Sequence, residues 1–411
     1  MKSFVINNRK KVFDLINNNE AAVFFCGNSA HKVGDEFYPF TPNRNFYYLT
    51  GLSEPGLVLL LSKYDDNPET RLFIKRPDPE TAKWTGAYLT EWECENISGI
   101  KDFSFIDEFD KYINDKICQK TITNIYIDFD KQVPKNVSPA IDFAEKIIAN
   151  SPVPQISDIS GFMASLRAVK ADFEVENIKK AIQITKNGIY SMMKNAKPDM
   201  YEYELEAYFD FELKRKGVFD KAFASIIAGG KNAAVLHYSA NNCPVTNGSL
   251  VLCDVGAAWG YYSGDITRTF PINGTFTGRQ RELYSIVLEG NLLTQELIKP
   301  GIPFKSLNEN LIDFYAKALK SIGLISLKED VKKYYWHKVS HFLGLETHDI
   351  GRGDEGVITE GMVFTVEPGL YIADEGIGIR IEDDVLVSKD GCICLSEDII
   401  KKPGDIEEFM K

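Results

Sequence analysis

The chain has 411 residues, a length that accommodates about two or three domains at roughly 150 residues each. Apolar residues make up 44% of it and charged residues 26%, the composition of a globular protein with a sizeable core. The net charge of −12 argues against a nucleic-acid-binding protein, which needs a basic face for phosphate. With 26 Phe, 19 Tyr and 4 Trp, the chain is also too aromatic for a disordered segment.

Nothing in the sequence predicts a membrane span or a secretory signal. The longest aliphatic run, residues 57–61, has the length of a strand, whereas a span needs roughly 18 apolar residues. The N-terminal stretch 1–20 is basic but lacks a continuous apolar core. The seven cysteines are odd in number and scattered, which favours buried free thiols over a disulfide framework. We therefore expect a cytoplasmic protein with neither a membrane nor a nucleic acid as partner.

The first 150 residues alternate short strand-like runs with helical ones. Four runs rich in apolar residues predict strands, at 22–26, 56–62, 71–75 and 124–128, and the segment 138–150 predicts a helix. Such alternation is typical of an α/β layer domain. The stretch 151–154 carries two prolines and interrupts every pattern. We place the domain boundary there, with an N-terminal domain at 1–153 and a second domain at 154–411.

The second domain begins with two predicted helices, at 172–194 and about 203–215. The first has apolar residues at a helical period and acidic residues in its first turn. The elements that follow are predicted strands at 249–255 and 261–270, helices at 279–298 and 306–322, and strands at 362–366 and 376–386. The order of two helices and then strands is thus repeated, which indicates two similar halves that face each other.

Histidine is rare in this chain but concentrated in one segment. Of the five histidines, three are His337, His341 and His348, whereas His31 and His237 lie far from them in the sequence. Three histidines so close together in a histidine-poor chain favour a shared function over three separate structural roles.

Acidic side chains lie in or beside apolar strands, where a carboxylate is costly unless it is paired or bound to a metal. Asp254 lies near the end of one predicted strand, and Asp265 follows a Gly- and Tyr-rich segment that we expect to fold back as a hairpin. Glu367 comes at the end of another strand, and Arg380 and Glu382 are predicted to share one face of a third.

One imidazole and four carboxylates form an oxygen-rich ligand set, which suits Mn²⁺, Fe²⁺ or Co²⁺ better than the site of a structural zinc ion. Four carboxylates carry four negative charges, which two divalent ions would balance, whereas one ion would leave a large buried charge. The expected cofactor is therefore a pair of divalent ions, with Mn²⁺ ahead of Co²⁺ and Fe²⁺.

The ordered series of histidines and acids resembles the pita-bread metallopeptidase family, which includes methionine aminopeptidase, prolidase and aminopeptidase P. Residues 37–55, FYPFTPNRNFYYLTGLSEP, also resemble the N-terminal domain of aminopeptidase P. The resemblance extends over nearly the whole chain. It implies an α/β N-terminal domain of the creatinase/aminopeptidase P type, followed by an α+β pita-bread catalytic domain. One departure is Lys338, because the family usually has Gly after the first histidine of the cluster.

The resemblance implies a set of metal ligands. Asp254 would bind one metal ion, Asp265 and Glu382 would bridge both, and His341 and Glu367 would complete the ligands of the second ion. Two ions that share a water would lower its pKa and polarise the scissile carbonyl. Glu367 would then carry a proton from this water to the leaving nitrogen.

Further side chains are expected to contact the substrate. His337 and His348 would donate hydrogen bonds to the tetrahedral intermediate, and His237 resembles the substrate-side histidine of the family. Tyr371 would contribute to an apolar wall for proline, and Arg167 matches a family arginine that we assign to substrate binding. The sequence leaves open whether Arg380 binds a substrate carboxylate or holds Asp254 in place.

The implied activity is the removal of the N-terminal residue from peptides with proline in second position. The first alternative is prolidase, which is restricted to Xaa-Pro dipeptides and has almost the same metal motifs. The N-terminal segment favours the aminopeptidase over it. A non-catalytic peptide-binding module on the same scaffold would have lost metal ligands, and all five are present here. The aromatic N-terminal domain, including Trp84, resembles one that reaches a neighbouring subunit's site, so we expect a homo-oligomer, either a dimer or a tetramer.

Overall fold

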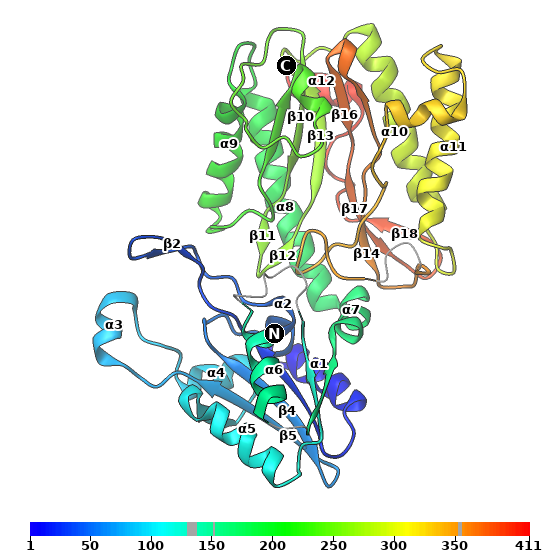
Figure 1. The fold of residues 1–411 in the computed structure, drawn as a ribbon. Helices are drawn as coiled ribbons and strands as arrows, with labels where there is room; N and C mark the ends of the chain where they lie inside the picture. Colours follow the sequence, from blue (N-terminus) through cyan, green and yellow to red (C-terminus); the bar gives the residue numbers. More distant parts are fainter. Residues whose placement is uncertain (130–137, 151–152, 352–355) are drawn as a thin grey trace. The chain divides into compact units, whose positions relative to one another are not determined.

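The computed structural model describes residues 1–129, 138–150, 153–351 and 356–411 (Figure 1). The chain divides into two compact units, Met1–Met163 and Ala164–Lys411. This division lies after the boundary predicted at residue 153, because β8 (Gln155–Asp158) pairs in parallel with β7 (Asn124–Ile127) of the N-terminal sheet. Residues 151 and 152 of the predicted boundary lie outside the described residues.

A six-stranded mixed sheet organises the N-terminal unit, with its strands in the order β6-β5-β4-β1-β7-β8. The neighbours β4–β5 and β1–β4 are antiparallel, whereas the three outer pairings are parallel. The other strands of this unit are β1 (Glu20–Phe25), β4 (Val58–Tyr64), β5 (Asn67–Ile74), β6 (Asp102–Phe105) and the short hairpin β2 (His31–Val33) and β3 (Glu36–Phe37). The α-helices are α1 (Lys2–Leu15), α2 (Arg44–Thr50), α3 (Pro79–Thr85), α4 (Glu91–Ser98), α5 (Phe109–Cys118) and α6 (Pro139–Asn150). The next helix, α7 (Ser160–Ala168), includes the division between the units.

The core of this unit lies between the sheet and the apolar faces of α5 and α6. Phe109 and Ile113 of α5 and Phe143 of α6 pack with Val23 and Phe73 of the strands, and all five side chains are buried. Each strand expected in this unit is present within a few residues of its predicted position, and α6 matches the predicted helix. The apolar periodicity therefore located these elements correctly.

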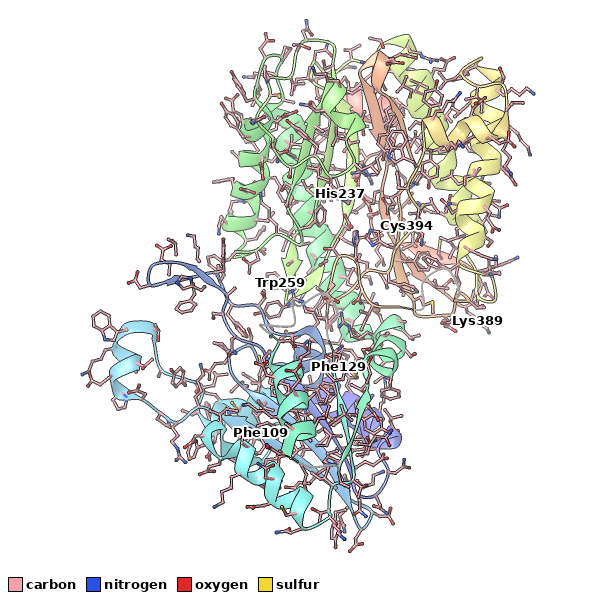
Figure 2. The ribbon with its side chains drawn as sticks, viewed as in Figure 1. Phe109, Phe129, His237, Trp259, Lys389 and Cys394 are labelled. Carbon is pink, nitrogen blue, oxygen red and sulfur yellow. The ribbon has the colours of Figure 1, made fainter. Side chains whose placement is uncertain are left out.

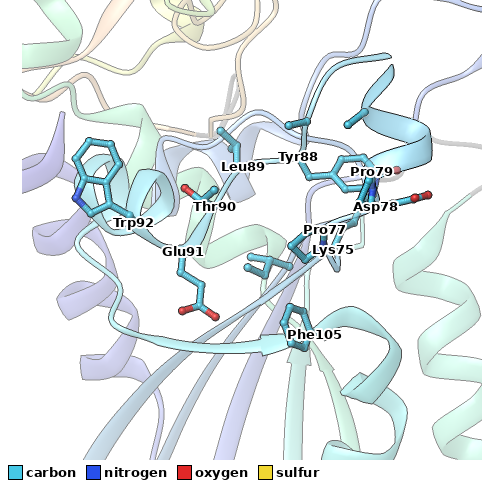
Figure 3. A pocket seen from close by; sticks show the side chains of 13 residues that line it. Lys75, Pro77, Asp78, Pro79, Tyr88, Leu89, Thr90, Glu91, Trp92 and Phe105 are labelled. Atoms are coloured by element: carbon cyan, nitrogen blue, oxygen red, sulfur yellow. The ribbon is translucent and has the colours of Figure 1, made fainter. Parts of the chain in front are cut away.

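An apolar pocket of about 610 Å³ opens beside α3 and α4 (Figure 3). Its lining includes Pro77, Tyr88, Trp92 and Phe105, and the Lys75 ammonium lies 4.6 Å from the centre of the Tyr88 ring. Trp84 of α3 is 87% exposed. The expected subunit contact of this tryptophan stays a prediction.

The C-terminal unit arranges small sheets between two pairs of helices (Figure 1). The helices α8 and α9 accompany a sheet of order β13-β10-β9, and α10 packs against strands of the second half. The elements of the first half are α8 (Asp172–Asn195), α9 (Glu202–Arg215), β9 (Ile226–Gly229), η3 (Gly230–Ala234), β10 (Leu250–Val255), β11 (Ala258–Trp259), β12 (Tyr262–Ser263) and β13 (Ile266–Pro271). Those of the second half are α10 (Gly278–Leu297), α11 (Lys305–Ser321), η4 (Lys328–Lys333), β14 (Val363–Val366), β15 (Gly369–Ile372), β16 (Ile377–Arg380), β17 (Asp383–Val387), β18 (Cys392–Cys394) and α12 (Pro403–Phe409).

Two predicted strands are each divided in the structure. The segment expected at 261–270 forms β12 and β13, which are separated at Gly264, where the backbone lies against α8. A Cβ on Gly264 would be 3.0 Å from the backbone nitrogen of Ile182, so a larger residue would require the backbone of α8 to move. The segment expected at 376–386 forms β16, which pairs with β15, and β17, which pairs with β14. Arg380 and Glu382 therefore do not share one face of a single strand.

Two further expectations concern cysteines and membranes. All seven cysteines are free thiols, as predicted; Cys26, Cys94 and Cys253 are buried, but Cys118 is exposed. Within the described residues, the structure holds no helix that combines the length and the hydropathy of a bilayer span.

Candidate metal centre

Antiparallel pairing brings three of the acidic side chains together. Asp254 on β10 lies opposite Thr267 on β13, and Asp265 directly precedes β13. The segment between the two aspartates forms the β11–β12 hairpin, as predicted. Glu382 directly precedes β17, and its backbone N–H donates to the Thr267 carbonyl at 3.1 Å. The divided strand thus places Glu382 beside β13.

The second half supplies Glu367 and His341. Glu367 directly follows β14, and the N–H of Thr365 on this strand donates to the His341 carbonyl at 2.9 Å. Nδ1 of His341 lies 3.1 Å from the Phe342 carbonyl, which can only accept. Nδ1 therefore carries a proton, and Nε2 is left as the nitrogen that can bind a metal.

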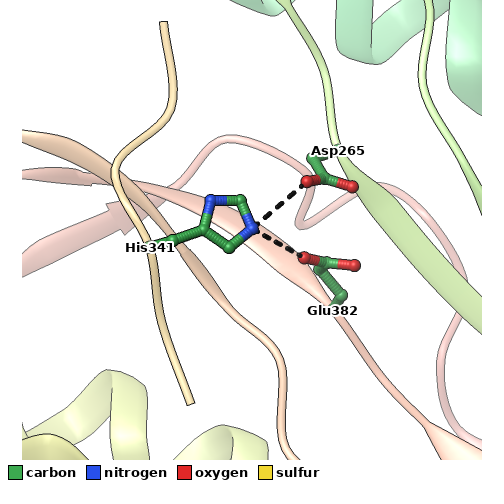
Figure 4. Close-up of side chains that lie close together, drawn as sticks. All are labelled: Asp265, His341 and Glu382. Atoms are coloured by element: carbon green, nitrogen blue, oxygen red, sulfur yellow. Dashed lines mark ion pairs between the residues drawn. The ribbon is translucent and has the colours of Figure 1, made fainter. Parts of the chain in front are cut away.

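The carboxylates of Asp265 and Glu382 both face Nε2 of His341 (Figure 4). It lies 3.4 Å from Asp265 Oδ2, 3.5 Å from Glu367 Oε1 and 4.0 Å from Glu382 Oε1. One ligand atom each from Asp265, His341 and Glu382 lies within 4.8 Å of the others. These three residues therefore have the spacing of ligands around a common cation.

Asp254 is linked to this group through Arg380. The Arg380 guanidinium donates to Asp254 Oδ2 at 2.6 Å, to Thr267 Oγ1 at 3.1 Å and to the Tyr371 hydroxyl at 3.0 Å. The Thr267 hydroxyl in turn donates to Glu382 Oε2 at 2.6 Å. Of the two roles left open by the sequence, the structure therefore shows Arg380 holding Asp254.

The acids are crowded enough to need added positive charge. Burial, followed by mutual repulsion, raises the pKa of Asp254 to about 6 and that of Glu367 to about 7, although Arg380 and His341 oppose the shift. The pKa of Glu382 is raised well above its usual range, first by burial and then by Asp265, Glu367 and Asp254. Asp254 Oδ1 is buried without a hydrogen-bond partner among the described residues. An oxygen-rich, buried and partly unsatisfied donor set fits divalent cations.

Three more histidines were expected near these ligands. His337 Nε2 lies 2.8 Å from the Tyr371 hydroxyl, and the His348 ring centre lies 4.3 Å from that of His341. His237 is exposed (Figure 2). It is close enough to His337 and His348 to contribute, after burial, to the lowering of their pKa. His237 lies in a turn after η3.

Both ring nitrogens of His337 are used inside the protein. Nδ1 lies 2.8 Å from the Lys338 carbonyl, an acceptor, so Nδ1 must carry hydrogen. Burial, together with the positive charge of Arg380, lowers the pKa of His337 to about 3, so the ring is neutral and Nε2 accepts from Tyr371. The Lys338 side chain is exposed. The structure thus shows His337 orienting Tyr371, and its expected donation to a reaction intermediate stays a prediction.

The two side chains assigned to substrate binding are both buried. Tyr371 is 1% exposed, with its hydroxyl between His337 and Arg380. Arg167 is 2% exposed and forms ion pairs with Asp349 and with Glu346, the latter at 2.9 Å. Burial argues against direct substrate contact by Arg167, whose role in binding stays a prediction.

The sequence analysis did not predict the cluster of buried ion pairs around Asp349, which lies at the end of the histidine segment 337–348. Lys170 donates to Asp349 Oδ2 at 3.0 Å, and Asp349 also pairs with Arg167. Burial alone would raise the pKa of Asp349, but the two cations outweigh it and hold this pKa below its usual range. Because Asp349 directly follows His348, the cluster fixes the end of the histidine segment.

Glu174 on α8 lies close to the same cluster, and we predict that it makes stability depend on pH. Burial is the main reason that its pKa rises from 4.5 to about 7. A raised pKa in the folded state means that ionisation costs stability, and the cost grows as the pH rises from about 4.5 to about 7. Glu174→Gln removes this cost, which at about 1.4 kcal/mol per pKa unit amounts to up to roughly 3 kcal/mol above pH 7.

The measurement is thermal unfolding of both proteins at pH 5 and pH 8. We expect the variant to be more stable than the wild type at pH 8, and the advantage to shrink at pH 5. A variant that is less stable than the wild type at pH 8 would contradict the prediction.

Comparison with known families identifies the chain. Residues 176–389 match metallopeptidase family M24, and residues 5–126 match the N-terminal domain of aminopeptidase P. The chain belongs to metallopeptidase family M24. The M24 region contains each of the five expected metal ligands, and membership confirms the predicted family and hydrolase class.

Relatives of this M24 protein match over almost its full length. The Xaa-Pro aminopeptidases of Haemophilus influenzae and Escherichia coli are 33% and 32% identical to it, and each alignment covers 98% of this chain and 96% of the relative. A Bacillus anthracis structure assigned as an aminopeptidase P is 45% identical with a TM-score of 0.97, covering 100% of this chain and 98% of that one. E. coli aminopeptidase P with the inhibitor Pro-Leu is 30% identical with a TM-score of 0.91 and the same coverage. These matches confirm the expected two-part fold.

Membership in M24 implies divalent metal ions, in agreement with the donor set. A zinc-substituted E. coli aminopeptidase P also matches this chain, with a TM-score of 0.91.

Proposed function

We propose that this M24 enzyme is a metallo-aminopeptidase that hydrolyses the N-terminal Xaa-Pro bond of peptides. The observation that carries the proposal is the clustering of Asp265, His341, Glu367 and Glu382, with Asp254 linked to them through Arg380. The similarity to Xaa-Pro aminopeptidases over the full chain supports the choice of substrate. A proline nitrogen carries no hydrogen once it is in a peptide bond, so this bond needs a dedicated site.

The donor set supports a site for two divalent ions. Asp254, Asp265, His341, Glu367 and Glu382 would hold them, and four carboxylates balance two divalent charges better than one. When bound, such ions activate a water and polarise the scissile carbonyl. The dinuclear state, the preference for Mn²⁺, a homo-oligomeric assembly and a cytoplasmic location all belong to this proposal. Elemental analysis of the purified protein measures the number and the identity of the ions.

Glu367 is the residue best placed to move a proton. Its Oε1 lies 3.5 Å from His341 Nε2, and its Oε2 lies 3.8 Å from His337 Nδ1. A carboxylate held among these groups would accept a proton from the attacking water and deliver it to the proline nitrogen. His237 and His348 are exposed, so their nitrogens are accessible to donate to the oxygen on which charge develops.

Substrate length tests the proposal against an Xaa-Pro dipeptidase. The sequence left open whether Arg380 binds a substrate carboxylate, as a dipeptidase would require, but this guanidinium is 4% exposed and bonded to Asp254, Thr267 and Tyr371. We therefore expect the metal-loaded protein to cleave Ala-Pro-Ala and peptides beginning Arg-Pro-Pro, as well as Ala-Pro. Ala-Ala-Ala serves as the control without proline.

Each outcome of this assay discriminates between functions. Turnover of Ala-Pro alone would replace the aminopeptidase with a dipeptidase. Binding of Ala-Pro-Ala without turnover, in protein shown to contain its metal, would favour the non-catalytic peptide-binding module.

A further inference from the structure

His237 is presented by a long connection that has little regular structure of its own. This connection leaves β9 at Gly229, passes through η3 and a turn, and reaches Cys243 before β10 begins at Leu250. Because such a segment has few internal hydrogen bonds, its conformation depends on tertiary anchors. The segment between Gly229 and Cys243 is called the His237 loop below.

A single buried carboxylate anchors both ends of this loop. Glu202, the first residue of α9, is 0% exposed. Its Oε1 accepts the Gly229 N–H at 2.8 Å, and its Oε2 accepts the Cys243 N–H at 2.9 Å. The backbone N–H of Glu202 also donates to the Cys243 carbonyl at 3.0 Å. The entry and the exit of the loop are therefore tied to one residue.

The same carboxylate also binds the interior of the loop. Asn232 Nδ2 donates to Oε1 at 2.9 Å, and the Tyr238 hydroxyl donates to Oε2 at 2.7 Å. Four accepted hydrogen bonds use the lone-pair sites that two carboxylate oxygens offer. Since Tyr238 directly follows His237, holding its ring fixes the backbone that carries the histidine.

Packing connects the loop to the metal centre. Leu236 and Tyr238 flank His237 and pack against a buried cluster that includes Tyr371. Tyr371 in turn bonds His337 and Arg380. The position of His237 relative to the site thus depends on how Glu202 holds the loop.

We propose that Glu202 is a positioning residue that acts on catalysis through His237. The proposal rests on the proposed function, because it requires His237 to contact the substrate. Glutamine at this position keeps one oxygen but places an NH₂ group against two of the four donors. The Tyr238 hydroxyl can rotate and accept a hydrogen bond from this NH₂ group. One backbone N–H at an end of the loop cannot do so and is left without its acceptor.

The test is a double-mutant cycle on the metal-loaded enzyme with Ala-Pro-Ala as substrate. We expect Glu202→Gln to lower kcat/KM by about fivefold to tenfold in the wild-type background, the effect of one lost hydrogen bond. In the His237→Ala background, the same substitution should change kcat/KM by less than about twofold, because its target is already absent. Metal content should equal that of the wild type in all four proteins. Glu204→Gln is the matched control, since it makes the same change in the same helical turn on an exposed side chain.

Hydrogen exchange supplies a readout that does not depend on activity. Glu202→Gln should speed amide exchange within 229–243, and Glu204→Gln should not. If Glu202→Gln fails to fold, Tyr238→Phe takes its place in the double-mutant cycle. This substitution removes one of the four hydrogen bonds to Glu202 and retains the aromatic ring.

Several results would overturn the proposal. Equal losses of kcat/KM in both backgrounds would make Glu202 a purely structural residue, and loss of metal would show that it acts on the ligands. Unchanged exchange within 229–243 would show that it does not anchor the loop. If the wild type cleaves no Xaa-Pro peptide, the proposed function fails, and the positioning role of Glu202 fails with it. If His237→Ala retains full turnover, His237 has no role in catalysis, and Glu202 cannot act through it. In both cases, amide hydrogen exchange within 229–243 still shows whether Glu202 anchors the loop.

Discussion

Replacing Glu367 with glutamine is expected to lower kcat by about 10²–10⁴-fold, the range in which general acid–base catalysis contributes. The substitution removes a proton carrier but keeps the size of the side chain. Burial raises the pKa of Glu367 to about 7, so the carboxyl in the metal-free chain takes up and releases protons near neutral pH. Because binding of the peptide does not require this proton transfer, affinity for a slowly cleaved Xaa-Pro peptide should change little.

Glu367 is also an expected metal ligand, so metal content has to be measured for the same samples. The matched control is Glu360→Gln, which makes the same chemical change on an exposed side chain of the same unit. A Glu367→Gln variant with its full metal content and a kcat like that of the wild type would refute the catalytic role.

Replacing Glu382 with glutamine is expected to act in opposite directions on the metal-free and the metal-loaded protein. Burial and then the charges of Asp265, Glu367 and Asp254 raise the pKa of Glu382 well above its usual range. A raised pKa in the folded state means that stability is lost as the pH rises and the group ionises. At pH 8, the metal-free variant should therefore unfold at a higher temperature than the metal-free wild type.

With metal present, the order should reverse. The variant loses a ligand, which should weaken metal affinity by more than the roughly 10–100-fold that loss of an outer-shell partner costs. At saturating metal for the wild type, the stabilisation from binding should shrink by more than about 1.4–2.7 kcal/mol. Thermal unfolding with and without Mn²⁺ measures both effects, and Glu360→Gln should show neither. A metal-free variant less stable than the wild type at pH 8 would contradict the argument that ionised Glu382 destabilises the metal-free protein.

Local sequence patterns located most elements of the fold. The helical period of α8 and the apolar runs of β1 and β10 are properties of adjacent residues, so they are visible without tertiary information. The hairpin between Asp254 and Asp265 was predictable because its turn contains Gly260, which adopts positive φ, whereas the positive φ of Tyr261 is unusual for a bulky residue.

The divided strands show where local patterns are insufficient. The segment 376–386 has the composition of one strand, yet β16 and β17 pair with different neighbours. Its division after Arg380 is decided by long-range hydrogen bonds, such as that from the Glu382 N–H to the Thr267 carbonyl. Strand propensity alone contains no information about such partners.

The sequence by itself determined the family, the hydrolase class and which side chains could serve as metal ligands. These conclusions depend on residue type and order along the chain, and carboxylates and imidazole have the same ligand chemistry in any fold. Thr267 could have been noticed two residues after Asp265, on the same side of a strand.

Only the tertiary structure decided what the supporting residues do. It pairs Arg380 with Asp254, buries Arg167 beside Asp349, uses both nitrogens of His337 and directs four donors to Glu202. Apart from the Lys338 carbonyl beside His337 Nδ1, each of these partners lies far away in the sequence. A buried polar group must satisfy its hydrogen bonds with whatever the fold places beside it, so its partners follow from three-dimensional packing and not from the residues next to it in the chain.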